Sequence, residues 1–197
     1  DLDRKVLRVA STLSVAGGEY TFAAPKTSRA RRSIDVPPFV LGYLRRQLHA
    51  FRNGLRGVHI DDTFGKQMLP FAAMLPDENA IRNVTAYIAS LPGHDAEATI
   101  AGDANRGRSL FTTCAACHGT RGQGNWALNA PRLADMSDWY LVRQLGNFQL
   151  GVRGGHRQDY YGWQMATMAD SLADERAIND IVAYINTLNP EPARTAM

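Results

Sequence analysis

The 197-residue sequence has only two cysteines, no long apolar run and little net charge, and each shortage excludes a class of protein. Because the two cysteines lie three residues apart, none remains for a structural disulfide, for more thiolate ligands of a zinc site, or for a copper centre with its own cysteines. No apolar stretch approaches the roughly 20 residues of a transmembrane helix. The formal charge of +3 is too small to indicate nucleic-acid binding.

The two cysteines stand in the sequence Cys114-Ala-Ala-Cys117-His118. This spacing is typical of c-type haem attachment, in which two thiols on a helical turn each add to a haem vinyl group and the histidine binds the iron. A redox dithiol would need a βαβ setting that the flanking sequence does not offer. We therefore predict one covalent haem c, with His118 as the proximal iron ligand.

The chain also contains an internal repeat with an offset of 97 residues, as from Tyr43 to Tyr140. A period of this length is too long for a solenoid and indicates two tandem domains of one fold. The matched pairs include Leu44/Leu141, Gln47/Gln144, Phe51/Phe148, Gly54/Gly151, Arg56/Arg153, Gly57/Gly154, His59/His156, Asp62/Asp159, Gly65/Gly162, Met68/Met165 and Tyr87/Tyr184.

Both copies show helical patterns, which predicts an all-α fold. Apolar side chains recur at helical spacing over 40–53 and 137–150, and again over 77–91 and 174–188. A further helix is expected to begin at Asp103, as an N-cap, and to lead into the cysteine motif.

The first copy lacks the haem motif. At the offset of 97, Gly17, Tyr20 and Thr21 stand where the second copy has its two cysteines and its histidine. The stretch from Ser11 to Ala24 could form a short hairpin there. We predict a haem-less module at 1–93, a linker at 94–102, a haem-binding module at 103–189 and a loose tail at 190–197.

On these residues the chain resembles the tandem-domain, di-haem type of c-type cytochromes. The likeness covers the second module from about Asp103 to Leu188 and the first only from about Pro38 to Leu91. The resemblance implies that Pro131 accepts a hydrogen bond from the proximal histidine and that Leu133 packs on the haem face. It also implies that the first and last helices of this module cross closely. The residues at this crossing would be Gly107 and Phe111 on the first helix and Tyr184 on the last.

The resemblance further implies that Met165, in a loop before a helix, is the distal iron ligand. Met168 is the alternative, three residues on. His156 could in principle bind iron, but its counterpart His59 lies in the copy without a haem motif, so we interpret both as loop residues. Met68 is interpreted as a core residue that corresponds to Met165.

Several residues are candidates for the surroundings of the haem. Trp126, Trp163 and Tyr140 could line its edge, with ordinary aromatic packing as the alternative. Arg132 or Arg153 could neutralise a propionate, with solvent exposure as the alternative.

The function expected from this resemblance is one-electron transfer in the periplasm between protein partners, an electron donor and an acceptor, rather than catalysis. A targeting segment is expected to have preceded Asp1. The alternative is a cytochrome subunit bound permanently in a larger oxidoreductase or respiratory complex, with the haem-less module as docking platform and the segment Pro37–Leu41 facing the partner. An open-site enzyme is a third reading, disfavoured because no distal His–Arg pair can be placed.

Overall fold

The structure, a computed structural model, describes residues 6–8, 12–16, 19–23, 33–35, 38–91 and 97–189. Contacts divide the chain into two units: Asp1–Arg46 with Leu75–Pro92, and Gln47–Met74 with Gly93–Met197. The segment Gln47–Met74, here called the inserted segment, therefore comes from the first copy but belongs to unit 2.

The division predicted from the repeat, at 1–93, 94–102, 103–189 and 190–197, stays a prediction. Part of the predicted linker, the whole predicted tail and Pro37 lie outside the described residues.

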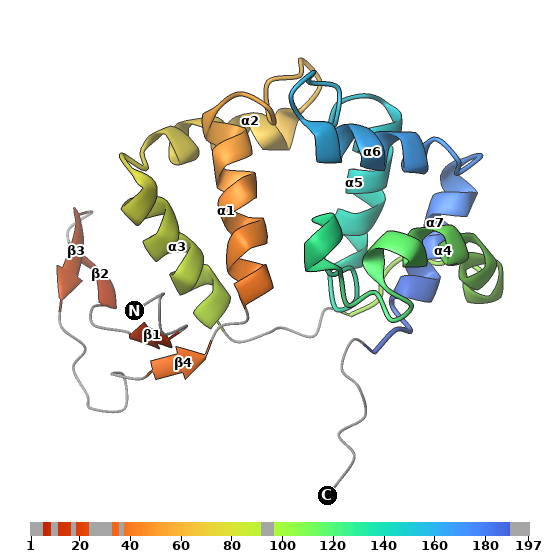
Figure 1. Ribbon diagram of the computed structural model, residues 1–197, viewed down its shortest axis with the longest axis horizontal. Helices are drawn as coiled ribbons and strands as arrows, with labels where there is room; N and C mark the ends of the chain where they lie inside the picture. The colour runs from red at the N-terminus through yellow and green to blue at the C-terminus, as the bar shows by residue number, and fades with distance from the viewer. Residues whose placement is uncertain are drawn as a thin grey trace, which may run out of the picture. The chain divides into compact units, whose positions relative to one another are not determined.

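The helices confirm the all-α class, and short strands accompany them near the N-terminus (Figure 1). Strand β2 (Thr12–Ala16) pairs antiparallel with β3 (Glu19–Ala23), so the predicted hairpin is confirmed. Strands β1 (Val6–Arg8) and β4 (Ser33–Asp35) also pair antiparallel and were not predicted. The remaining elements are α1 (Pro38–Arg52), α2 (Thr63–Ala73), α3 (Glu78–Ser90), α4 (Ala104–His118), the 3-10 turn η2 (Trp126–Leu128), α5 (Asp138–Gln149), α6 (Tyr160–Ala169) and α7 (Glu175–Ile185).

Aspartate side chains begin most of these helices by accepting backbone N–H groups of the first turn. Asp103 accepts from Asn105 at 2.9 Å, so the predicted N-cap of α4 is confirmed. The expected helix starts near residues 77 and 174 are confirmed in the same way, because Asp77 and Asp174 cap α3 and α7.

Two helices, α2 and α6, were not predicted. Each follows an aspartate cap: Asp62 accepts from Gly65 N at 2.8 Å, and Asp159 accepts from Gly162 N at 3.0 Å. An early glycine in both, and Pro70 inside α2, weaken the local helix signal. The placement of Met165 in a loop before a helix was wrong, because α6 includes it.

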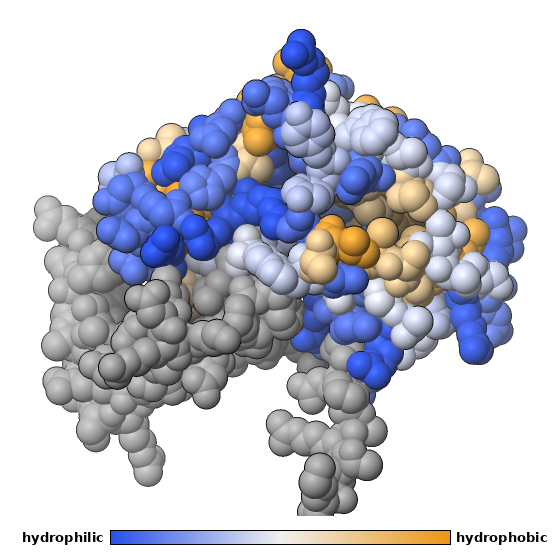
Figure 2. Space-filling view, in the orientation of Figure 1, coloured by the Kyte–Doolittle hydropathy of each residue, from blue (hydrophilic) through white to orange (hydrophobic). Residues whose placement is uncertain are grey.

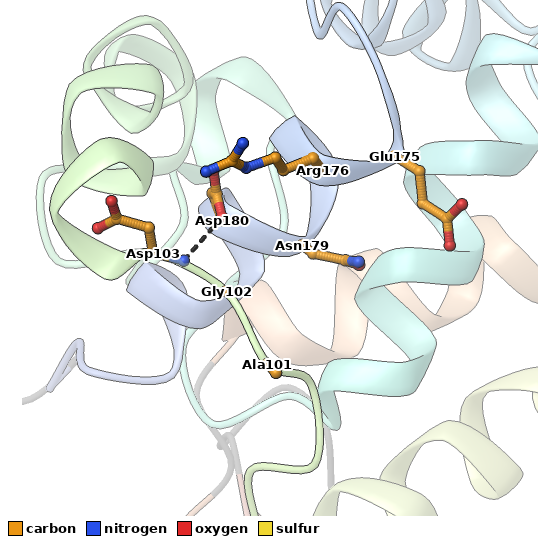
Figure 3. Close-up of a pocket in the computed structure, with 7 residues that line it drawn as sticks. All are labelled: Ala101, Gly102, Asp103, Glu175, Arg176, Asn179 and Asp180. Atoms are coloured by element: carbon orange, nitrogen blue, oxygen red, sulfur yellow. Dashed lines mark hydrogen bonds between the residues drawn. The ribbon is translucent and has the colours of Figure 1, made fainter.

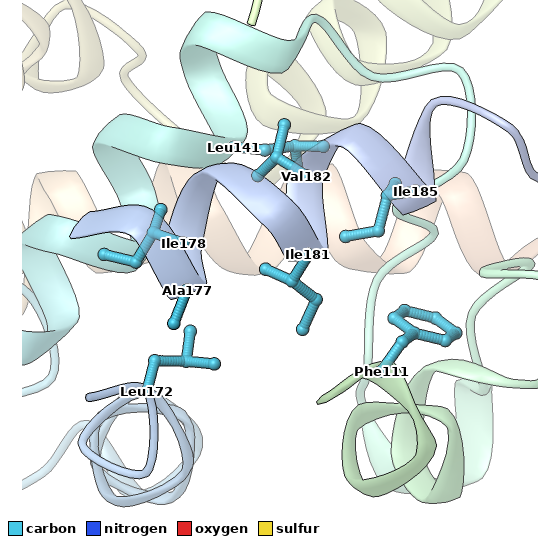
Figure 4. Packing of buried hydrophobic residues seen from close by; sticks show 8 residues of the cluster. All are labelled: Phe111, Leu141, Leu172, Ala177, Ile178, Ile181, Val182 and Ile185. Atoms are coloured by element: carbon cyan, nitrogen blue, oxygen red, sulfur yellow. The ribbon is translucent and has the colours of Figure 1, made fainter. Parts of the chain in front are cut away.

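The core of unit 2 lies between α4, α5 and α7 (Figure 4). Helix α7 supplies most of the fully buried apolar side chains, and the segments that it crosses supply the rest. The cluster consists of Phe111, Leu141, Leu172, Ala177, Ile178, Ile181, Val182 and Ile185.

The predicted helix crossing is confirmed at Gly107. A Cβ built there would lie 1.9 Å from the carbonyl oxygen of Asp180, so only glycine lets α4 approach α7 this closely. Beside it, the rings of Phe111 and Tyr184 pack with centroids 5.4 Å apart. In the part of the chain that the structure describes, no helix combines the length and apolarity that crossing a bilayer demands.

Asp138 ties the segment before α4 to the start of α5. Its buried carboxylate accepts hydrogen bonds from the backbone N–H and the hydroxyl of Thr99, from Ile100 N at 2.8 Å and from Trp139 N at 2.6 Å. Burial would raise the pKa of Asp138, but these hydrogen bonds outweigh it and hold the pKa below its ordinary value.

The variant Asp138→Asn is expected to lower the free energy of unfolding by about 1–3 kcal/mol at pH 7, because an amide N–H would face backbone N–H donors. The folded pKa is depressed, so this stabilisation is present above the unfolded value of about 4 and is lost as the pH falls through the folded pKa. Urea unfolding at pH 7 and near pH 3.5 measures it. Asp170→Asn, at an exposed site, is the control. A difference between the two variants that does not shrink at low pH would contradict the expectation.

Candidate functional site

Helix α4 carries both cysteines and the histidine of the motif in its last turns. Both thiols are free. Cys117 is exposed, whereas Cys114 is half-buried and packs against the core cluster. Burial raises the pKa of the Cys114 thiol, and nearby Cys117 raises it further, against a smaller opposing hydrogen bond to the backbone. The two thiols therefore lie one turn apart on α4, one partly buried beside the core cluster and the other exposed.

His118 is 5% exposed, and a single hydrogen bond fixes its ring. Its Nδ1 lies 2.7 Å from the carbonyl oxygen of Pro131. A carbonyl can only accept, so Nδ1 carries the proton and Nε2 keeps its lone pair. Burial lowers the pKa of His118, and the hydrogen bond to Pro131 only partly opposes this, so the ring is neutral at pH 7. A neutral imidazole with a free Nε2 is the form that binds a metal.

The loop after α4 brings Pro131 to the histidine. Gly124 has a φ of 83°, and its N–H donates to the carbonyl of His118 at 2.8 Å. A Cβ at Gly124 would lie 2.7 Å from the backbone nitrogen of Arg132, so the loop closes this tightly only around glycine. An antiparallel bridge between Asn125 and Ala130 completes the closure.

Other predicted site residues follow in this loop. Leu133 packs against the core cluster, as Cys114 does. Arg132 donates from Nε to the carbonyl of Ala134 at 2.9 Å and forms an ion pair with Asp135. Trp126 lies in η2 and is 55% exposed. The loop thus holds the Arg132 guanidinium through its own residues.

Both candidate distal methionines, Met165 and Met168, lie on α6 and are half-buried. Residues three apart share a face of a helix, so both side chains project to the same side. His156 lies outside the helices, is exposed, and accepts a hydrogen bond at Nδ1 from Gln158 N at 3.2 Å. His59 accepts in the same way from Asp61 N. The interpretation of both histidines as loop residues is confirmed.

Tyr140 and Arg153 contact the inserted segment. The hydroxyl of Tyr140 accepts from Arg56 Nη2 at 3.4 Å. Burial would raise the pKa of Tyr140, but the charges of Arg56 and Arg153 outweigh it and lower that pKa. Arg153 and Arg56 also bind two glutamines, Gln47 and Gln144. Sequence reasoning missed this polar cluster, although Gln47 and Arg56 match Gln144 and Arg153 in the repeat.

A shallow pocket lies at the opposite end of α4 from the cysteine motif (Figure 3). In it, Asp180 accepts from Asp103 N at 2.7 Å and from Arg106 Nη1 at 2.9 Å, so it serves the helix crossing. Its lining residues are Ala101, Gly102, Asp103, Glu175, Arg176, Asn179 and Asp180.

The residues around the motif fit a covalent haem. Two free thiols and a neutral, oriented imidazole stand on one helix. Apolar side chains gather on the face of unit 2 between α5 and α7 (Figure 2). Trp126 and Leu128 expose 55% and 48% of their surface, and a flat apolar group would cover such side chains. Among the described residues, no cluster of three or more His, Cys, Asp and Glu side chains offers a metal site of the zinc type.

Comparison with known proteins agrees with this site. The cytochrome c family model matches residues 104–189. Cytochrome c-554(548) of Halomonas halodenitrificans is 40% identical over 87 residues, which are 44% of this chain and 98% of that protein. The thiosulfate dehydrogenase electron acceptor of Stutzerimonas stutzeri is 33% identical over 140 residues, 66% of this chain and 61% of that protein.

A solved structure of Acidithiobacillus ferrooxidans cytochrome c4 superposes with a TM-score of 0.59 at 26% identity, covering 75% of this chain and 84% of that one. The chain spans less than two thirds of the length of the Stutzerimonas relative. The family model matches the part of the chain that contains Cys114, Cys117 and His118, and the chain covers 98% of the Halomonas protein. This chain is a member of the cytochrome c family.

Proposed function

We propose that the chain is a mono-haem c-type cytochrome that carries single electrons between protein partners in the periplasm. The observation that carries the proposal is the hydrogen bond from His118 Nδ1 to Pro131 O at 2.7 Å, beside two free thiols on the same helix. This hydrogen bond leaves Nε2 of a neutral ring free to bind a ligand.

Cys114 and Cys117 would anchor the haem. In each attachment the S–H bond of a thiol adds across a vinyl double bond, so one C–S and one C–H bond form and nothing leaves. When bound, the haem supplies an iron that alternates between the ferric and ferrous states. His118 would bind one side of that iron, and the carbonyl of Pro131 makes its imidazole a stronger donor.

We propose Met165 on α6 as the ligand on the other side, with Met168 as the alternative. A thioether is a soft donor that favours the ferrous state and raises the potential. If His118 and Met165 both bound the iron, the protein would leave it no open position for a substrate, which supports electron transfer rather than catalysis. The name of the Stutzerimonas relative, an electron acceptor, supports the same function.

We also propose that the first copy holds no haem. Tyr20 and Thr21, which stand where the second copy has Cys117 and His118, lie in strand β3 rather than in a helix. In the second copy, covalent haem attachment through Cys114 and Cys117 supports a periplasmic location.

The test of the proposal is an optical spectrum of the purified protein in both oxidation states, with pyridine haemochrome quantitation. One haem per chain and the near-infrared sulfur-to-iron band in the ferric form are expected. Two haems would overturn the haem-less first copy. A high-spin spectrum would overturn methionine ligation. A stoichiometric partner that stays bound through purification from the native source would favour the complex subunit over the free carrier.

The distal ligand is tested by two matched substitutions, Met165→Leu and Met168→Leu. We expect only Met165→Leu to abolish the sulfur-to-iron band and to lower the midpoint potential by on the order of 0.1 V, since axial ligands set haem potentials over about 0.8 V. Met68→Leu, at the corresponding position of the first copy, is the control. Met68 is 37% exposed, so its interpretation as a core residue was wrong. Loss of the band in Met168→Leu alone would reverse the assignment.

A further inference from the structure

A four-residue cluster joins the inserted segment to the haem-motif copy inside unit 2. Arg56 donates from Nη1 to Gln47 Oε1 at 2.6 Å and from Nη2 to Gln144 Oε1 at 3.1 Å. Arg153 donates from Nη1 to Gln144 Oε1 at 2.7 Å and from Nη2 to Gln47 Oε1 at 3.3 Å. Each arginine thus binds the glutamine of its own copy and the glutamine of the other. We call this set the arginine–glutamine exchange.

Buried aromatic rings fix both guanidinium groups. Arg56 lies over the ring of Phe51 at 4.6 Å, and Arg153 lies over the ring of Phe148 at 4.5 Å. Phe51 and Phe148 are 7% and 6% exposed. A stacked planar guanidinium loses little further freedom when it forms hydrogen bonds, so the exchange is preorganised from both sides.

Helix α5 connects this exchange to the haem site. On one side, Gln144 and Tyr140 bind Arg56. Another side of the same helix places Leu141 in the core cluster, against which Cys114 and Leu133 pack. A displacement of α5 toward or away from the inserted segment would therefore move a wall of the haem site.

Two further contacts extend this connection. At the end of α5, Gln149 Nε2 donates to the carbonyl oxygens of Ala169 at 3.0 Å and Leu172 at 2.8 Å, which ties α5 to the end of α6. Helix α6 carries both candidate distal methionines. Nearer the start of α5, Arg143 lies 3.9 Å over the ring of Phe64 on α2, a second contact with the inserted segment.

We propose that Arg56, which belongs to the copy without a haem motif, is a positioning residue of the haem site. Through the arginine–glutamine exchange it fixes α5, and through α5 it holds in place α6, which carries both candidate distal methionines. This inference rests on the proposed haem at Cys114, Cys117 and His118. The proposal also gives a role to the first copy, which lacks the haem motif. Part of that copy serves as a fixed support for the haem site of the second copy.

The test compares Arg56→Met with Arg82→Met in the full, haem-loaded chain. Both substitutions remove one positive charge, and Arg82 lies on α3, where it forms a largely exposed ion pair with Glu78. The readouts are the midpoint potential and the affinity of the ferric protein for imidazole, which competes with the distal methionine. A looser α6 is expected to make imidazole bind Arg56→Met about tenfold more tightly than wild type. Arg82→Met should match wild type.

Arg56→Lys separates position from charge. A lysine keeps the charge but lacks the planar fork that reaches both glutamines, so we expect tighter imidazole binding and a shifted potential here too. This variant also serves if Arg56→Met yields no folded protein. Equal affinities and potentials for Arg56→Lys and wild type would overturn the proposal. A wild-type chain without haem would instead overturn the proposed function, which the haemochrome assay reports separately.

Discussion

Replacing Gly107 with alanine is expected to destabilise the haem-motif copy by about 3 kcal/mol, the largest effect that we expect from a single added methyl group at a glycine of the described residues. The added Cβ would lie 1.9 Å from the carbonyl oxygen of Asp180 and 2.9 Å from the Cβ of Tyr184. The first of these atoms belongs to the backbone of α7 and the second is bonded to it, so neither can move aside as the end of a flexible side chain could. Helices α4 and α7 would have to separate, which would loosen the packing of Phe111 and Tyr184.

Gly146→Ala is the matched control for this prediction. Gly146 lies inside α5, and an added Cβ there meets nothing within 4 Å. The same chemical change should therefore stabilise the protein by roughly 0.5–1 kcal/mol, because alanine loses less conformational entropy in a helix. Urea unfolding followed by far-ultraviolet circular dichroism measures both variants. If the two alanines had the same effect, the close approach of α4 to α7 would not determine stability.

Replacing His118 with alanine is expected to remove most of the low-spin haem. The substitution deletes the neutral imidazole that the hydrogen bond to Pro131 orients, and it leaves the partly buried carbonyl of Pro131 without that donor. Haem that still attaches through Cys114 and Cys117 should be high-spin and should lack the sulfur-to-iron band. Pyridine haemochrome quantitation and the ferric spectrum measure these two effects.

His156→Ala is the control for His118→Ala, because His156 is exposed and accepts only a local backbone hydrogen bond among its described contacts. We expect one low-spin haem per chain in this variant. His118→Ala with an unchanged spectrum would show that another residue binds the iron. A loss of haem in His156→Ala would reopen that histidine as a ligand.

Helix starts were predictable because an N-cap is a local arrangement: an aspartate and the N–H groups two or three residues after it suffice. Asp77, Asp103 and Asp174 begin helices as expected. The same local signal stood before α2 and α6, at Asp62 and Asp159. Those helices were missed because their sequences show a weak apolar period, and their positions depend on packing against other segments.

The sequence alone determined the haem motif at Cys114, Cys117 and His118, the repeat, the hairpin and the order of the main helices, because each is a pattern of near neighbours or a direct comparison of two stretches. Only the tertiary structure decided which nitrogen of His118 keeps its lone pair. It also joined Gln47–Met74 to unit 2 and made Arg56 and Arg153 bind each other's glutamines. These contacts link residues up to 106 positions apart, and folding alone brings such residues together.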